Sequence, residues 1–305
     1  MGTIVLLLLL LQDAPVFTSK VSLVRVDAAV SDGTRTFDGL KKEDFRIFDN
    51  GVEQAVTSFS QDQEPLDLIL VFDTSGSMRP IVERVAAAAG QALGELRPGD
   101  RVAVWTFTVR SRVLAPFTDD LKAVERTLQV DLMNWHFGGG TFLQAAVDDA
   151  AEFLKNEPRT TRRRAVLTFT DDYGQKTRRE KTVVERYWEA DAVLSELIIR
   201  GGLAQAINVV GMATPGGALR HLLLNGTIQH IVDKTGGETL RANDASADFP
   251  QMMQRIRRRY SLYFALPDSK PGSHHELKVD LTDDAKKRFP GAHVRARKGY
   301  LRPAG

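Results

Sequence analysis

The chain has 305 residues, of which 43% are hydrophobic and 26% charged, a composition typical of a globular protein with one large domain and a small companion. Its 41 basic and 39 acidic residues leave a formal net charge of +2, which excludes attraction of the whole molecule to nucleic acid or an anionic membrane. Cysteine is absent, so disulfides, thiolate metal sites and cysteine nucleophiles are excluded.

The N-terminus carries a targeting signal. Residues 4–11 form an unbroken apolar run, shorter than the about 20 residues of a membrane span and of the right length for the apolar core of a signal peptide. The run is atypical, because no Lys or Arg precedes it and Pro15 follows Ala14 at the expected cleavage point. We expect residues 1–14 to be a signal-peptide remnant, the protein to be exported (periplasmic, surface-bound or secreted), and no transmembrane span; a buried strand is the alternative.

Residues 21–60 predict a small antiparallel β unit. Apolar residues alternate with others at the start of 21–30 and again on both sides of Asn50-Gly51. Asn-Gly is the strongest short hairpin signal, because both turn residues need positive φ. These strands are too few to stand alone, so they need partners from elsewhere in the chain.

After Pro65 the pattern changes to strands alternating with helices. Strands are expected at 66–72, 101–107, 113–117 and 165–169, and helices at 81–96, 121–130 and 141–154. The alternation predicts a doubly wound, mostly parallel sheet. The next strand is either 192–199 or 205–212, and 211–226 is expected to be an inserted loop with a short helix.

The last third of the chain returns to antiparallel patterns. We expect helices at 228–234 and 249–259, and strands at 238–240, 260–266, 275–281 and 293–298, with no helix between the last two. The strands at both termini need partners, which predicts one discontinuous β domain with the α/β domain inserted into it. The predicted boundaries are 15–62 for the N-terminal part, 63–245 for the α/β domain, and 246–305 for the C-terminal helix and remaining strands.

A polar motif follows the first buried strand. Residues 73–77 read DTSGS, which places one carboxylate and two hydroxyls on a tight loop that Gly76 allows to turn. Asp171 ends another strand, and Thr141 follows three glycines at a helix start. The carboxyl ends of parallel strands share one edge of the sheet, where ligands bind, so we expect these side chains to converge there.

Three hydroxyls and two carboxylates are hard oxygen ligands. They suit Mg²⁺, with Mn²⁺ or Ca²⁺ as alternatives, rather than zinc or copper. A cation with few anionic ligands keeps much of its charge and a water-occupied position, which an acidic side chain from outside can fill. The alternative for the motif is helix capping, in which Asp, Ser or Thr satisfies the N–H groups of the following helix. The candidate metal ligands are Asp73, Ser75, Ser77, Thr141 and Asp171.

The segments VFDTSGSM, GGGTF and LTFTDD together resemble the von Willebrand factor A family. The resemblance implies a metal-ion-dependent adhesion site in which Ser75, Ser77 and Thr141 contact the metal and Asp73 and Asp171 act largely through water. The family usually has glycine where this chain has Asp172. The flanks DGLKKEDFRIFDNGVEQAVTSF and VRARKGY resemble bacterial proteins of the acidobacterial VWFA-related group, which are typically exported.

The functional expectation is a binding module of the bacterial envelope or exterior, not an enzyme, whose protein partner presents a carboxylate to the cation. The alternatives are a metal-dependent hydrolase or phosphoryl-transfer enzyme, and a structural module whose metal only stabilises the fold. No G-x-S-x-G elbow and no phosphate-binding loop occurs. The ligand rim is expected to comprise His136, Phe137, Asp172 and Tyr173.

Several charged segments are interpreted as surface. The arginine clusters at 162–164 and 255–259 lack the context of a nucleic-acid site and are expected to be solvated. The basic segment Lys176 to Lys181 is expected to be an exposed loop beside the metal edge, which favours an acidic partner. The pair His274-His275 is expected in a turn.

Overall fold

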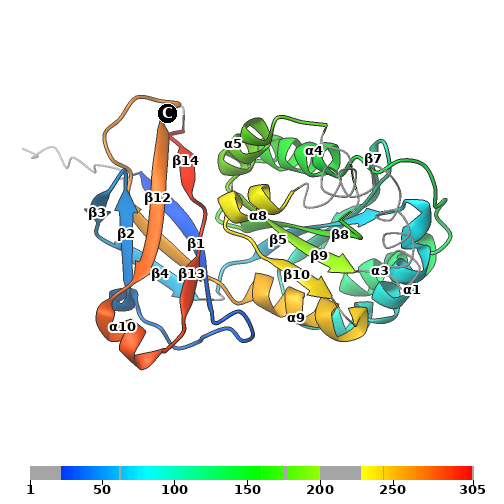
Figure 1. Cartoon of the computed structure of the whole chain (residues 1–305), viewed down its shortest axis with the longest axis horizontal. Coiled ribbons are helices and arrows are strands. Elements are labelled where there is room, and N and C mark those ends of the chain that lie inside the picture. The colour runs from blue at the N-terminus through cyan, green and yellow to red at the C-terminus, as the bar shows by residue number, and fades with distance from the viewer. Residues whose placement is uncertain are drawn as a thin grey trace, which may run out of the picture.

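The computed structural model describes residues 22–61, 63–158, 160–172, 174, 177–199, 228–242 and 244–303. Within these residues the chain forms one mixed sheet of six strands flanked by helices, and two antiparallel sheets of four strands each beside it (Figure 1). The predicted fold is confirmed: a mostly parallel α/β sheet accompanied by a discontinuous antiparallel β domain built from both termini.

The large sheet has the strand order β10-β9-β8-β5-β6-β7, and all neighbours are parallel except β6 and β7. Its strands are β5 (Leu66–Asp73), β6 (Arg101–Phe107), β7 (Ser111–Thr118), β8 (Arg163–Thr170), β9 (Ala192–Ile199) and β10 (Thr239–Ala242). Central β5 is buried along its whole length, with Leu70 in one helical layer and Val71 in the other. Of the two candidate strands, 192–199 forms β9; 205–212 and the predicted insertion lie outside the described residues.

The helices of this α/β domain cover both faces of the sheet. They are α1 (Arg79–Ala87), α2 (Ala89–Leu93), α3 (Leu121–Arg126), α4 (Leu143–Asn156), α5 (Glu180–Ala190), α8 (Gln229–Thr235) and α9 (Ala245–Arg257), with the short turns η2 (Gly76–Met78) and η3 (Thr127–Asp131), the latter π-helical. The single helix predicted at 81–96 is divided at Ala88, two residues before Gly90, a residue type that destabilises helix interiors.

The β domain joins the first strands of the chain to the last ones (Figure 1). Its elements are β1 (Leu23–Ser31), η1 (Lys42–Asp44), β2 (Phe45–Asp49), β3 (Val52–Gln54), β4 (Ser58–Gln61), β11 (Tyr260–Ala265), β12 (His274–Leu281), α10 (Asp283–Arg288), β13 (His293–Arg295) and β14 (Gly299–Leu301). The two sheets, β13-β1-β11-β4 and β14-β12-β2-β3, enclose a common apolar core. The β2–β3 hairpin turns through Asn50 (φ 49°) and Gly51 (φ 81°), as predicted.

Two predictions for the C-terminal region are wrong. A helix, α10, lies between β12 and β13, and its N-cap Thr282 accepts a hydrogen bond from Ala285 N. His275 belongs to strand β12 rather than to a turn: its ring is buried, contacts Asp49 Oδ1 through Nδ1 (2.7 Å) and stacks on Tyr300. The histidine is therefore a core residue of the β domain.

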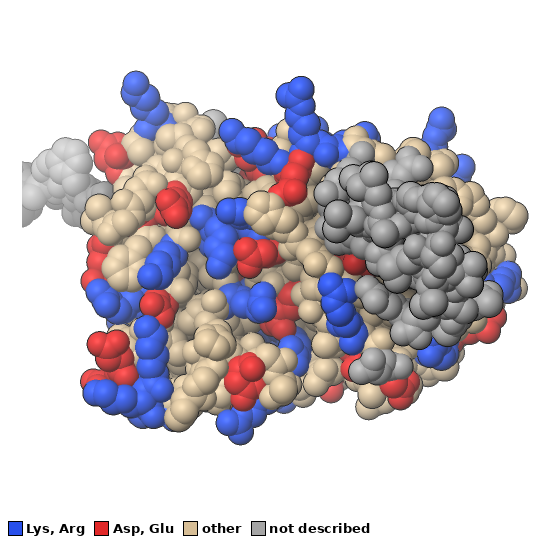
Figure 2. Space-filling view, viewed as in Figure 1, with Lys and Arg blue, Asp and Glu red and all other residues tan. Residues whose placement is uncertain are grey.

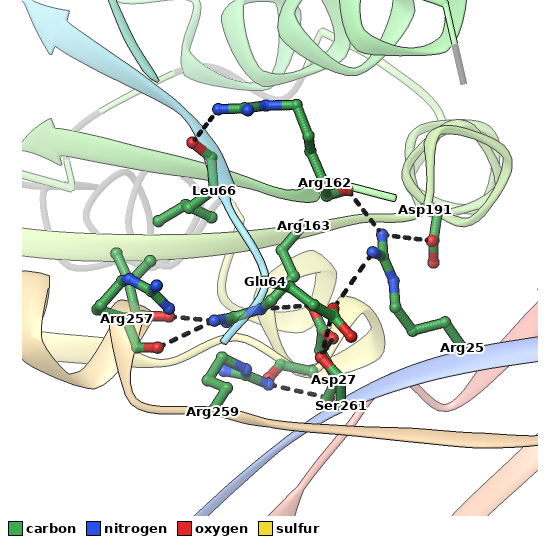
Figure 3. Close-up of polar contacts among 12 residues, drawn as sticks. Arg25, Asp27, Glu64, Leu66, Arg162, Arg163, Asp191, Arg257, Arg259 and Ser261 are labelled. Atoms are coloured by element: carbon green, nitrogen blue, oxygen red, sulfur yellow. Dashed lines mark hydrogen bonds and ion pairs between the residues drawn. The ribbon is translucent and has the colours of Figure 1, made fainter. Parts of the chain in front are cut away.

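The prediction that the arginine clusters are solvated is also wrong for most of their members. Five arginines are at most 6% exposed: Arg163, Arg164, Arg255, Arg257 and Arg259. Arg163 lies at the junction of the two domains, where its guanidinium donates to Asp27 Oδ2 (3.2 Å) and to the carbonyls of Ile256 and Arg257 (Figure 3). These five arginines therefore lie inside the molecule, where carboxylates and backbone carbonyls, several of them from distant parts of the chain, are their partners.

Charges at this junction are mutually compensated. Burial works to raise the pKa of Asp27, but Arg163, Arg25 and Arg259 outweigh it and lower that pKa to about 2. Arg25 donates to Asp191 Oδ2 (2.7 Å) and so ties β1 to the end of α5 (Figure 3). Such pairs are costly to desolvate, and removing one partner leaves a buried charge without its counter-charge.

The junction involves the amino ends of the parallel strands. Arg163 begins β8, and Arg25 donates to the carbonyls of Thr161 and Arg162 just before it. The carboxyl ends of the eight-residue strands β5 and β8 consequently lie roughly 25 Å away, on the side remote from the β domain (Figure 1).

On the face shown in Figure 2, basic and acidic side chains are interspersed over the β domain and the junction. In the described part of the chain, no helix is both long and apolar enough to cross a membrane.

Candidate metal-binding site

The DTSGS loop lies at the carboxyl end of β5, as the sequence predicts. Asp73 is the last residue of the strand and has no exposed surface, whereas Ser77 lies in η2 and is exposed. Ser75 N donates to Asp73 Oδ1 (2.8 Å), which folds the loop back onto the strand end before α1 begins. The loop therefore exposes Ser77 at the edge, while Asp73 and Ser75 are buried.

Four of the five predicted ligands form a connected set. Ser75 Oγ and Ser77 Oγ are 3.4 Å apart, and Ser77 Oγ donates to Asp171 Oδ2 (2.8 Å) from the end of β8. Asp73 Oδ2 accepts a bond from Thr170 Oγ1 (3.2 Å). Sequence reasoning missed Thr170; the parallel pairing of Phe72 with Phe169 places it directly beside Asp73.

The fifth residue, Thr141, lies on a loop fastened to the same edge. Gly138 N donates to Thr74 O (2.9 Å) and Phe142 N donates to Thr108 O (2.9 Å). Gly139 has φ 91°, a backbone conformation that glycine adopts without strain. The Thr141 carbonyl lies 3.3 Å from the position a Cβ would take at Gly174, so Thr141 is next to the segment that follows Asp171.

Electrostatics at the edge favour a cation. Burial, followed by the charge of Asp171, raises the pKa of Asp73 to about 7, and its hydrogen bonds from Ser75 and Thr170 only partly offset this. In the described residues Asp73 has no ion pair with Lys or Arg. A second buried carboxyl, Glu196 of β9, has its pKa raised to about 8 by burial and by Asp172.

The predicted rim residues differ in their surroundings. His136 is exposed, and Phe137 packs against the core with the Arg79 guanidinium 5.0 Å from its ring centre. Asp172 is buried rather than at the rim, and its φ of 61° is a left-handed conformation that Asp tolerates better than most residues. Its carboxylate accepts from Gln229 Nε2 (3.3 Å). Tyr173 lies outside the described residues.

The basic segment beside the edge is described only in part. Lys176 lies outside the described residues, while Arg178 and Lys181 are exposed. Arg178 Nε pairs with Asp148 (3.2 Å), so part of the segment's charge is already compensated within the domain.

The donor set fits a hard divalent cation. In the described ranges no three His, Cys, Asp or Glu side chains gather as a metal cluster, so the site is one of mixed hydroxyl and carboxylate oxygens. Those oxygens are the ligands that Mg²⁺, Mn²⁺ and Ca²⁺ accept, and they disfavour zinc or copper.

Comparisons with known proteins agree with the motif. Residues 68–175 match the family model of the von Willebrand factor type A domain, whereas a search of curated proteins finds no match. Among solved structures, the chain is similar to a von Willebrand factor type A protein from Catenulispora acidiphila, at 15% identity over 88% of this chain and 76% of that one, with a TM-score of 0.46.

Two further similar structures come from Bacteroides. One is BatB from Bacteroides thetaiotaomicron, at 17% identity, covering 63% of this chain and 97% of that one, with a TM-score of 0.45. The other is an aerotolerance-related membrane protein from Bacteroides fragilis, at 15% identity, covering 63% and 98%, with the same TM-score of 0.45. These low identities and TM-scores show a similarity and nothing further. The family model matches the segment that holds every candidate ligand, and so places residues 68–175 in the von Willebrand factor type A family.

Proposed function

We propose that this protein is a metal-dependent binding module, not an enzyme, in which a divalent cation at the Asp73 edge receives a carboxylate from a partner protein. The observation that carries the proposal is the convergence of Asp73, Ser75, Ser77 and Asp171, with a buried carboxylate at its base. Domains of the von Willebrand factor type A family commonly mediate protein interactions.

Two kinds of side chain would hold the cation: hydroxyls that bind it directly and carboxylates that supply negative charge. Ser75, Ser77 and Thr141 would supply neutral hydroxyl oxygens, while Asp73 and Asp171 would supply negative charge largely through water. A bound cation supplies a positive charge with an open position, to which a carboxylate oxygen of the partner binds. Mg²⁺ is the preferred ion, with Mn²⁺ or Ca²⁺ as alternatives.

The location of the edge favours recognition of a large partner. The β domain contacts the amino ends of the strands, and none of its described residues contacts the carboxyl edge at Asp73. Binding is preferred over hydrolysis because the hydroxyls of Ser75 and Ser77 contact each other and Asp171, with no histidine among their partners in the described residues. A serine nucleophile needs a base within reach that is itself oriented. We further propose export, which rests on the apolar run at 4–11.

The test is capture of a partner by the immobilised full chain in Mg²⁺, followed by excess EDTA. We expect release of the partner while the circular dichroism spectrum of the protein is retained. Thr141→Ala and Ser77→Ala should weaken capture much more than they lower stability. Ser58→Ala, at an exposed serine of the β domain, serves as the matched control. A partner that remains bound after the metal is shown to be gone would contradict the proposal.

A further inference from the structure

A cavity of about 250 Å³ lies beside residues 73–77, the proposed metal loop. Its wall includes Thr74, Thr108, Arg110, Arg112, Trp135 and Gly138. Thr74 is the residue between Asp73 and Ser75, and Gly138 begins the glycine run that leads to Thr141. The cavity is therefore bounded by both segments that carry the hydroxyl ligands.

The β6–β7 hairpin forms the remaining wall of the cavity, and hydrogen bonds join it to those two segments. Thr74 N and Thr74 Oγ1 both donate to Phe107 O, at 2.9 and 3.0 Å. Phe142 N donates to Thr108 O, and Thr106 pairs with Arg112 across the hairpin. A group bound in the cavity would consequently touch elements that are already fixed relative to the metal loop.

The cavity carries positive charge that the described part of the chain does not neutralise. Arg110 and Arg112 are exposed, and neither forms an ion pair or a side-chain hydrogen bond within the described part of the chain. Ser111 lies between the two arginines in the sequence, and its Oγ donates a hydrogen bond to the carboxylate of Asp149 (2.7 Å). That carboxylate forms no ion pair with Arg110 or Arg112. By contrast, the exposed Arg46 is bound by Glu53 through two hydrogen bonds.

We propose that this cavity binds a second acidic side chain of the same partner, with Arg110 and Arg112 as its cationic partners, while the metal takes the first. The inference rests on the proposed function and makes its ligand more specific: an acidic protein segment with two carboxylates rather than one. A guanidinium presents donors in a planar fork that matches a carboxylate, so two arginines beside one cavity select for that group. Trp135 adds a flat apolar wall beside it.

The position also explains how a generic metal contact gains specificity. A metal-bound carboxylate by itself distinguishes few partners, whereas a second charge at a set distance selects the spacing of acidic residues in the partner. The rest of the edge would repel a uniformly anionic polymer, because the carboxylate of Asp171 contacts Ser77 of the same loop.

The test uses fluorescein-labelled synthetic peptides of Gly, Ser and Ala that contain either one glutamate or two glutamates at varied spacing. Their binding to the full chain is measured by fluorescence anisotropy in Mg²⁺ and in EDTA. One spacing of the two glutamates is expected to bind about tenfold more tightly than one glutamate, the effect of an added charge-assisted hydrogen bond. Arg110→Gln with Arg112→Gln should abolish that advantage and leave the one-glutamate peptide unchanged. Lys122→Gln, at an exposed residue of α3 outside the cavity, should change neither.

The outcomes separate the two proposals. If binding needs Mg²⁺ but two glutamates give no advantage, or the advantage survives in the arginine variant, the cavity inference is wrong and metal recognition stands. If every peptide binds as tightly in EDTA as in Mg²⁺ and the arginine-dependent advantage persists, the proposed function is wrong, and only the recognition of a carboxylate by the arginine pair stands. If no peptide binds in Mg²⁺, both are contradicted. Inorganic phosphate that binds the arginine pair more tightly than any peptide would identify a small-anion site and overturn the inference.

Discussion

Two regions of the molecule each bury a carboxylate, and they shift its pKa in opposite directions. At the domain junction, Asp27 faces Arg163, and its pKa falls to about 2. At the opposite end of the six-stranded sheet to which Arg163 belongs, Asp73 is buried beside Asp171, and its pKa rises to about 7. Burial acts in the same direction on both residues, so the difference comes from the charges around them.

The comparison shows where the fold provides its own counter-charge. The junction is a structural contact that needs no ion from solution, because arginines of the chain compensate the charge of buried Asp27. At the metal edge, hydroxyls and a second carboxylate surround Asp73, which suits a cation that comes from solution. We therefore expect substitutions of the two aspartates to have opposite effects on the metal-free protein.

The largest effect is expected from Asp27→Ala. The substitution leaves Arg163, which is 2% exposed, without its carboxylate, and a broken buried pair costs about 3–5 kcal/mol of the free energy of unfolding. Urea denaturation of the full chain measures it. The matched control is Glu53→Ala, which breaks the exposed pair with Arg46 and should cost less than about 1 kcal/mol. Equal losses in the two variants would show that the junction is not a structural contact of the proposed strength.

The next effect is a pH dependence that belongs to the junction. The pKa of Asp27 is lowered on folding from 3.8 to about 2, so its contribution is complete above the unfolded value and is lost as pH falls through the folded one. About 2 kcal/mol of stability should disappear between pH 5 and pH 2 in the wild type. The same denaturation series on Asp27→Asn should lack this component; an identical slope in both proteins would contradict the assignment.

A smaller effect of opposite sign is expected from Asp73→Asn in EDTA. The amide keeps the shape of the side chain but removes a charge that burial, and then repulsion from Asp171, disfavours above the raised pKa of about 7, so the metal-free domain should gain about 1 kcal/mol at pH 8. Asp27→Asn under the same conditions should lose stability. Thermal unfolding with and without EDTA compares the two, and a loss in both variants would mean that Asp73 is compensated by the protein itself.

Much of the carboxyl edge at Asp73 could be predicted because its residues follow local rules. Asp73 and Asp171 each come at the end of an apolar strand, and parallel strands bring their carboxyl ends together. The hairpin at Asn50-Gly51 could also be predicted, because both residue types adopt the positive φ that its turn requires. These predictions depend on short stretches of sequence, which is why the structure confirms the strands and the turn.

The junction could not be predicted, because its pairs join distant residues. Arg163 meets Asp27 136 positions away, and a run of arginines has the same appearance in the sequence whether water or a carboxylate surrounds it. His275 is a similar case, since its partner Asp49 is 226 positions away. Helix α10 did have a local signal that was overlooked: Thr282 as N-cap, acidic residues in the first turn and basic ones in the last.

The most direct test of the central claim is calorimetric titration of the full chain with Mg²⁺ at neutral pH, beside Asp73→Asn and Ser77→Ala. The wild type should show saturable binding, Asp73→Asn none, and Ser77→Ala a weaker isotherm, because one loses charge and the other a neutral oxygen ligand. Ser58→Ala should match the wild type. An Asp73→Asn isotherm identical to that of the wild type, or a wild type that binds none of Mg²⁺, Mn²⁺ and Ca²⁺, would contradict a cation site at this edge.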